Sequence, residues 1–215
     1  KIVVSYNGAH PYFTNAGSIG VSFPLQDRYT DSVTCRDYRC HAHIFCGENT
    51  SYIMALRMGG AAPHLGMVLT KGSLSAYSIE RDLKLQSNDR GCFWLHPSAQ
   101  EFAPGDTMKL EWKVFPHRGR EDFREKLRAF PRVILVDAEQ YVIYPGETSK
   151  VTIEPTFSAE KVTINGASLE KTENGVYEYL FENEKTGEYV LSICADEVKT
   201  TCRLLVQERP ETLAA

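Results

Sequence analysis

The stretch HLGMVLTKGSLSAYSI, residues 64–79, decides the fold class of this chain. Two runs rich in apolar residues, 65–70 and 74–79, stand on either side of Lys71-Gly72. Runs of this length fit β-strands, and a glycine-containing pair between them is typical of a turn that reverses the chain. The stretch therefore predicts two consecutive β-strands.

The same pattern of apolar runs separated by turn residues extends over most of the first 118 residues. Further strands are predicted at 1–6, 18–23, 41–46, 51–58, 91–96 and 108–115. Turn residues interrupt them every eight to twelve positions, which is the pattern of a β-sandwich. One helix is predicted near 119–130, because Phe123, Leu127 and Phe130 line one stripe, and Pro131 then ends it.

A second block begins near residue 134. Its strands are shorter and alternate, and they are separated by turns at Asn165-Gly166, Asn174-Gly175 and Pro145–Glu147. This spacing is typical of a small immunoglobulin-like sandwich. The sequence thus predicts an all-β chain of two domains, a larger β-sandwich region at 1–133 and an Ig-like β-sandwich at 134–208.

The amino-acid composition restricts the kinds of partner that the chain can bind. The chain has 215 residues, a formal net charge of -4, 42% hydrophobic residues and 24% charged residues. There is no basic surplus for a nucleic acid to bind, and no apolar run approaches the ~18 residues of a membrane span. The chain opens on a strand and ends on a plain Leu-Ala-Ala, so we expect a piece of a longer protein, and whether a leader was removed stays open.

A cluster of cysteine and histidine residues at 35–47 invites a metal-site interpretation. If 40–46 is a strand, Cys40 and Cys46 share one face, while His41 and His43 share the other. Zinc ligands must converge on one point, so we predict no metal site here. The histidine pair, about 6.6 Å apart along its face, could bind a ligand if that face is open, and otherwise it is structural.

The cysteines give no clear disulfide pattern. Strand spacing separates Cys194 from Cys202 by about 10 to 13 Å across a turn near Asp196, which exceeds disulfide reach. Cys35 and Cys40 could close a small loop if the chain turns between them. The redox compartment therefore stays open.

No motif for nucleophilic, metalloprotease, phosphate-binding or dinucleotide chemistry is present, and we predict no cofactor. Glycoside hydrolysis needs only two carboxylates, which leave no local motif. The candidates Glu101, Asp106 and Glu111 each have a plainer structural explanation, as a turn or a solvated strand position.

Aromatic residues are the other candidate surface. Trp112 shares an apolar strand face with Met108, Leu110 and Val114, which favours the core. Trp94 shares its face with His96, so it could line a cleft or belong to the core.

Several short motifs carry a resemblance that covers about residues 1–150. They are Leu65-Gly66, Leu69-Thr70, Gly72-Ser73-Leu74, Asn88, Arg90-Gly91, Glu111-Trp112, Phe115-Pro116-His117, Gly119 and Asp122-Phe123, together with 42–47 and 55–60. The set resembles the N-terminal β-supersandwich, of galactose-mutarotase-like fold, in a poorly characterised bacterial family of six-hairpin glycosidase type. In that architecture a helical toroid follows the sandwich and usually supplies the catalytic carboxylates.

The resemblance implies a non-catalytic β-domain region of a glycoside-hydrolase-like protein that supports or shapes a neighbouring helical catalytic domain. The alternative is a stand-alone module that binds carbohydrate or protein through Trp94, His96 and the His41/His43 face, and a complete small enzyme ranks last. His117 and Arg118, at the corner before the helix, are expected to be exposed, where they could contact a ligand or the neighbouring domain. An extracytoplasmic or cell-surface location in a bacterium fits this expectation, while the sugar and the oligomeric state stay open.

Overall fold

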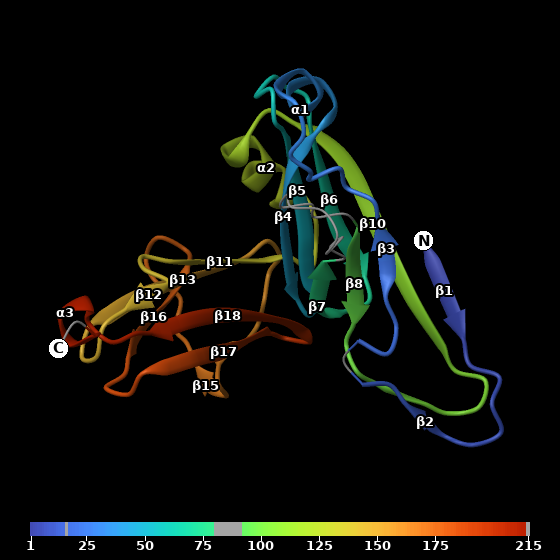
Figure 1. The fold of residues 1–215 in the computed structure, drawn as a ribbon. Coiled ribbons are helices and arrows are strands. Elements are labelled where there is room, and N and C mark those ends of the chain that lie inside the picture. Colours follow the sequence, from blue (N-terminus) through green and yellow to red (C-terminus); the bar gives the residue numbers. More distant parts are fainter. Residues whose placement is uncertain (16, 80–91, 214–215) are drawn as a thin grey trace. The chain divides into compact units, whose positions relative to one another are not determined.

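The computed structural model describes residues 1–15, 17–79 and 92–213 (Figure 1). Strands dominate it, which confirms the predicted all-β class. The chain forms two compact units, Lys1–Pro131 and Arg132–Ala215, and each has its own hydrophobic core. The galactose-mutarotase-like and Ig-like assignments stay predictions. None of the helices in the described part of the chain is long and apolar enough to cross a membrane.

Unit 1, Lys1–Pro131, is built on a five-stranded antiparallel sheet. In spatial order its strands are β1 (Ile2–Ser5), β10 (Thr107–His117), β6 (His64–Lys71), β5 (Thr50–Arg57) and β4 (Cys40–Gly47). The stretch 64–79 forms β6 and then β7 (Leu74–Ile79). Gly72 makes the turn between them with φ +99°, a conformation that favours glycine.

A second layer covers part of one face of this sheet. It consists of β3 (Val21–Phe23), β8 (Phe93–Pro97) and β7, with β8 in the centre. A separate ribbon pairs β2 (Tyr12–Phe13) with β9 (Glu101–Phe102). The buried core of unit 1 comprises Ile53, Met67, Leu69, Leu74, Leu95, Phe102, Met108 and Leu110. Side chains from both sheets contribute to it, as in a sandwich.

Helix α2 (Arg120–Leu127) lies on the opposite face of the five-stranded sheet (Figure 1). On β5, Ile53 joins the core between the sheets, while its neighbour Tyr52 contacts Phe123 of the helix. Phe123 and Leu127 are buried, so the predicted apolar stripe is correct. The helix ends at Leu127, earlier than predicted, because the last residues up to 130 form tighter turns.

A short helix escaped the sequence analysis. Helix α1 (Ser32–Tyr38) begins after Asp31, whose side chain accepts a hydrogen bond from the Thr34 N–H at 2.9 Å. None of its residues is buried, so the sequence has no apolar stripe from which the helix could be predicted. Cys35 lies in this helix and remains a free thiol, and no loop closes to Cys40.

Unit 2, Arg132–Ala215, contains two further sheets. The first orders β11 (Ile134–Ala138), β13 (Thr148–Pro155) and β16 (Tyr177–Glu182), and the second orders β12 (Val142–Ile143), β18 (Val198–Val206), β17 (Gly187–Ala195), β14 (Val162–Ile164) and β15 (Ala167–Ser168). A short helix α3 (Pro210–Leu213) follows. In the β17–β18 hairpin, Cys194 is opposite Lys199 and Cys202 is opposite Leu191, which confirms that these two cysteines do not pair.

One core prediction on β10 is wrong. Trp112 packs partly buried against the core of unit 1, with its ring 5.4 Å from that of Phe23, as predicted. Val114, predicted on the same apolar face, is 61% exposed. Alternation placed Val114 on the correct face, but at this end of the strand the face borders an open groove instead of the second layer.

Candidate functional site

Trp94 and His96 lie on the outer face of the three-stranded sheet. Along β8, Phe93 and Leu95 point into the core of unit 1, so the two residues between and after them point outward. Trp94 is 37% exposed. The sequence analysis left its position open between core and cleft, and the structure places it on an accessible face.

The side chains around Trp94 are small and polar. Ser22 on β3 and Ser78 on β7 are its cross-strand neighbours. The two nitrogens of His96 are both engaged: Nδ1–H donates to the Ile19 carbonyl oxygen at 3.0 Å, and Nε2 accepts from the Ser78 hydroxyl at 2.8 Å. These bonds hold the imidazole in one orientation beside the indole.

The chain at Gly20 passes close to the rings of Trp94 and His96 because glycine has no Cβ atom. A Cβ atom at position 20 would lie 3.1 Å from the Trp94 ring and 3.4 Å from the His96 ring. The 3.1 Å contact with the indole is tighter than most real Cβ contacts, whereas 3.4 Å is close to an ordinary van der Waals distance. We conclude that the indole and the imidazole are positioned by packing as well as by hydrogen bonds.

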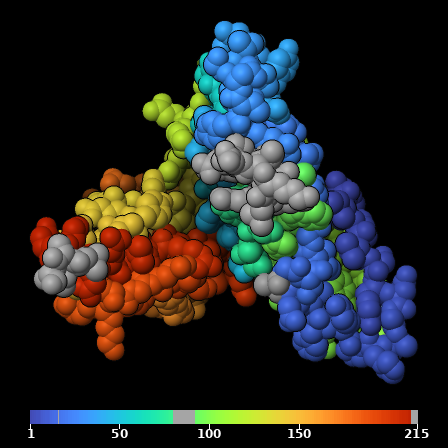
Figure 2. Space-filling view, in the orientation of Figure 1, coloured from blue at the N-terminus to red at the C-terminus, as the bar shows by residue number. Residues whose placement is uncertain are grey.

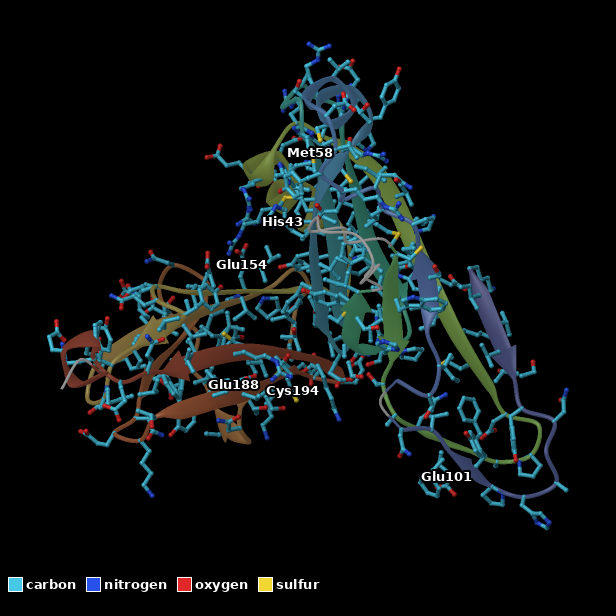
Figure 3. The ribbon with its side chains drawn as sticks, viewed as in Figure 1. His43, Met58, Glu101, Glu154, Glu188 and Cys194 are labelled. Carbon is cyan, nitrogen blue, oxygen red and sulfur yellow. The ribbon has the colours of Figure 1, made fainter. Side chains whose placement is uncertain are left out.

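The two histidines that the sequence analysis singled out on β4 contact different side chains. The His41 Nδ1 atom lies 3.3 Å from the Tyr29 hydroxyl, whereas the His43 Nε2 atom accepts a hydrogen bond from Arg120 at 3.2 Å. Each imidazole thus has a separate partner; Figure 3 labels His43. Among the residues that the structure describes, no group of three or more His, Cys, Asp or Glu side chains could hold a metal ion.

The expected exposure of His117 is wrong. Its side chain is only 1% exposed, because β10 carries it beneath the start of helix α2. The Nδ1–H group donates to the Gly119 carbonyl oxygen at 2.9 Å, and the ring lies 5.1 Å from that of Phe123. Arg118 is exposed as predicted and forms an ion pair of 3.3 Å with Asp122. At this corner Arg118 is therefore exposed and His117 is buried.

His64 was missed by the sequence analysis. It is buried directly opposite His117 in the β6–β10 register, with the two rings 5.3 Å apart. Its Nδ1 atom accepts a hydrogen bond from the Arg57 N–H at 3.1 Å. Burial, together with the nearby His117 and Arg57, lowers the pKa of His64. No local sequence signal marks the pair, because its members are 53 positions apart.

The three carboxylates considered for glycoside chemistry serve other contacts or stand apart. Glu111 forms an ion pair of 3.1 Å with Lys1, which lowers the pKa of this carboxyl. Asp106 accepts the Ala103 N–H at 2.8 Å within a turn, as its position predicted. Glu101 lies on the β2–β9 ribbon (Figure 3).

A groove of about 500 Å³ opens beside helix α1 in unit 1. Its lining comprises Leu25, Asp37, Tyr38, Arg39, Cys40, Ala55, Arg57, Pro63, His64, Leu65, Val114, Phe115 and Pro116. Most of these side chains are apolar, and the large side chains of Tyr38, Leu65 and Val114 are exposed. This is an uncovered apolar surface on the first unit.

Comparison with known proteins finds similarity among solved structures. No protein-family model and no curated protein matches the sequence. Among solved structures, the chain is similar to the polysaccharide lyase BACCELL_00875, with a TM-score of 0.85 and 31% sequence identity. The match covers 98% of this chain but only 32% of that chain. This chain thus spans about one-third of the length of the lyase.

The motif residues Asn88, Arg90 and Gly91 lie outside the described residues, so that part of the resemblance is not tested by the structure.

Proposed function

We propose that this chain is the non-catalytic β-sandwich region of a carbohydrate-active protein, in which it supports or shapes a neighbouring catalytic domain. The observation that carries the proposal is the match to a polysaccharide lyase over nearly this whole chain. Because the match occupies only 32% of the lyase, two-thirds of that protein lies outside the matched part. A partner domain of comparable kind would cover surface that is open in this chain.

The groove beside α1 supports this role. Val114 and Leu65 are aliphatic and lie on adjacent interior strands of the sheet, yet both are exposed. Contiguous apolar surface of this kind marks sites of interaction on soluble proteins. Arg39 and Arg57 also line the groove, and arginine is enriched at interfaces.

Two measurements test the proposal. The isolated chain is incubated with a panel of neutral and acidic polysaccharides, and the release of shorter saccharides is followed; we expect none, and turnover by the isolated chain would refute the non-catalytic role. In the lyase, the matching third is then deleted. We expect a lower melting temperature or loss of the folded protein, and an unchanged, fully active remainder would argue against a supporting role.

The exposed Trp94 favours a second candidate function, binding of a glycan by the outer face of the three-stranded sheet. An indole beside serine hydroxyls and an oriented imidazole offers a flat apolar face and nearby hydrogen-bonding groups. A glycan-array and affinity-gel screen compares the wild type with Trp94→Ala and with Trp112→Ala. Binding lost in a folded Trp94→Ala variant supports this function, and unchanged binding excludes this face.

A further inference from the structure

The β2–β9 ribbon of unit 1 carries exposed aromatic side chains that neither proposed role uses. Tyr12 is opposite Phe102 and Phe13 is opposite Glu101, so Tyr12 and Phe13 lie on opposite faces of the ribbon. Tyr12 is 50% exposed and Phe13 is 66% exposed. The N-terminal segment that contains them, in blue, lies at the surface in Figure 2.

The ring of Tyr12 is held in place from below. It stacks on Tyr6, with the ring centroids 5.8 Å apart and the planes 23° from parallel. Tyr6 in turn contacts Phe102, which is buried in the core, at 6.1 Å. Tyr6 thus links Tyr12 to the buried Phe102 through one stacked and one tilted ring contact, so Tyr12 needs little further ordering to bind a ligand.

The middle ring of this column is also fixed. The Tyr6 hydroxyl donates a hydrogen bond to the His10 carbonyl oxygen at 2.6 Å. The intervening loop lies directly against the ring, since a Cβ atom at Gly8 would lie 2.1 Å from the Tyr6 phenol oxygen. Glycine at this position therefore permits the loop to pack against Tyr6.

Phe13 provides an internal comparison. It is more exposed than Tyr12, yet among the described residues no aromatic ring stacks on it. Its neighbour across the ribbon is the exposed carboxylate of Glu101 (Figure 3). The two positions share the ribbon and differ in whether the ring is supported.

The size of the exposed surface separates the kinds of partner. An aromatic side chain has about 150–250 Å² of surface, so the exposed part of Tyr12 amounts to roughly 75–125 Å² and that of Phe13 to roughly 100–165 Å². A stable protein interface needs about 800 Å² from each partner. A single supported ring instead matches the apolar face of one sugar ring. Asp106, whose backbone carbonyl oxygen accepts a hydrogen bond from the Tyr6 N–H at 2.9 Å, and the net charge of -4 disfavour nucleic acid and strongly acidic glycans.

We propose that Tyr12, supported by Tyr6 and Phe102, is a stacking platform for one ring of a neutral saccharide. The proposal rests on the carbohydrate-related role proposed above and adds a site and a ligand class to it. The platform is distinct from the Trp94 face, which belongs to another sheet. The flat ring supplies the contact, and its prior ordering keeps the entropic cost of binding low.

Affinity gel electrophoresis with xyloglucan, galactomannan and mixed-linkage β-glucan tests the proposal on the full 215-residue chain. We expect Tyr12→Ala to weaken retardation by about tenfold or more, Tyr12→Phe to preserve it, and Phe13→Ala to change it by less than about twofold. Tyr12→Leu is a second variant that keeps an apolar contact with Tyr6 but removes the flat face, and we expect it to lose binding. Tryptophan fluorescence confirms that each variant is folded.

Three other outcomes would refute the proposed platform. Equal loss in Phe13→Ala would indicate non-specific adhesion by exposed apolar surface, and loss only in Trp94→Ala would assign binding to the other face. Absence of retardation with all three polysaccharides would also refute the site. None of these results affects the domain role, which is tested separately by cleavage assays and by deletion in the lyase.

Discussion

Phe123 joins helix α2 to the five-stranded sheet, and its truncation should destabilise unit 1 selectively. The buried ring contacts Tyr52 at 5.6 Å, Phe115 at 5.6 Å and His117 at 5.1 Å. Buried Phe→Ala substitutions cost about 3–5 kcal/mol. We expect about 3 kcal/mol, because a helix at the surface can partly close the cavity. Phe130→Ala, at a partly buried ring, is the matched control and should cost less.

The chain offers a separate probe for each unit. Both of its tryptophans, Trp94 and Trp112, lie in unit 1, so their fluorescence follows the urea unfolding of that unit alone. Labelling of the buried Cys202 thiol follows unit 2. With a slope of about 2 kcal/mol per M, the fluorescence midpoint of Phe123→Ala should fall by about 1.5 M urea. A fall equivalent to less than about 1 kcal/mol would refute the proposed anchoring of the helix.

Three further predictions concern burial and backbone. Because the pKa of His64 is lowered in the folded state, the unfolded state binds the proton more readily, so the stability of unit 1 should be complete above about pH 6.5 and decline as the pH falls below it. Urea midpoints monitored by fluorescence at pH 7.5 and 5 should show this decline in the wild type and a smaller decline in His64→Gln. A wild type whose stability does not depend on pH would contradict the prediction. Gly72→Ala places a methyl group 2.7 Å from a backbone carbonyl oxygen at φ +99°, whereas Gly60→Ala, at φ +76°, meets open space. In thermal melting we expect Gly60→Ala to lower the stability by about 1 kcal/mol and Gly72→Ala to lower it by more. Equal losses of stability would show that the close contact at position 72 relaxes. Burial raises the pKa of Cys46 to about 12 and of Cys202 to about 11, so both thiols should resist a thiol reagent at pH 8 until the protein unfolds, and fast labelling of the native protein by mass spectrometry would disagree.

Local alternation correctly predicts which side chains share a strand face, whereas ligand binding by the Trp94 face stays a prediction. The face shared by Trp94 and His96 follows from strand periodicity, and β8 displays it. Whether that face is open depends on what lies above it, which no local pattern encodes. The same reason explains the error at His117, because a polar residue at a strand-to-helix corner is exposed unless the following helix folds back over it, and here α2 does so.

The platform at Tyr12 shows the same limit. The sequence analysis did not single out Tyr6, which ends the predicted strand 1–6, or Tyr12, whose strand β2 has only two residues. Their stacking depends on Phe102, which is 90 positions after Tyr12 in the chain. Only the pairing of β2 with β9 brings these rings together.

The sequence by itself determined the all-β class, most strands of the large sheets and the turns that join them. These features depend on residues within a few positions of one another: period-two alternation selects the strands, and Asn165-Gly166 makes its turn with both φ angles positive. The tertiary structure alone decided the strand order, the pairing of His64 with His117 and the exposure of Val114. Such features depend on which distant segments bury which face, and burial is a property of the whole packed chain.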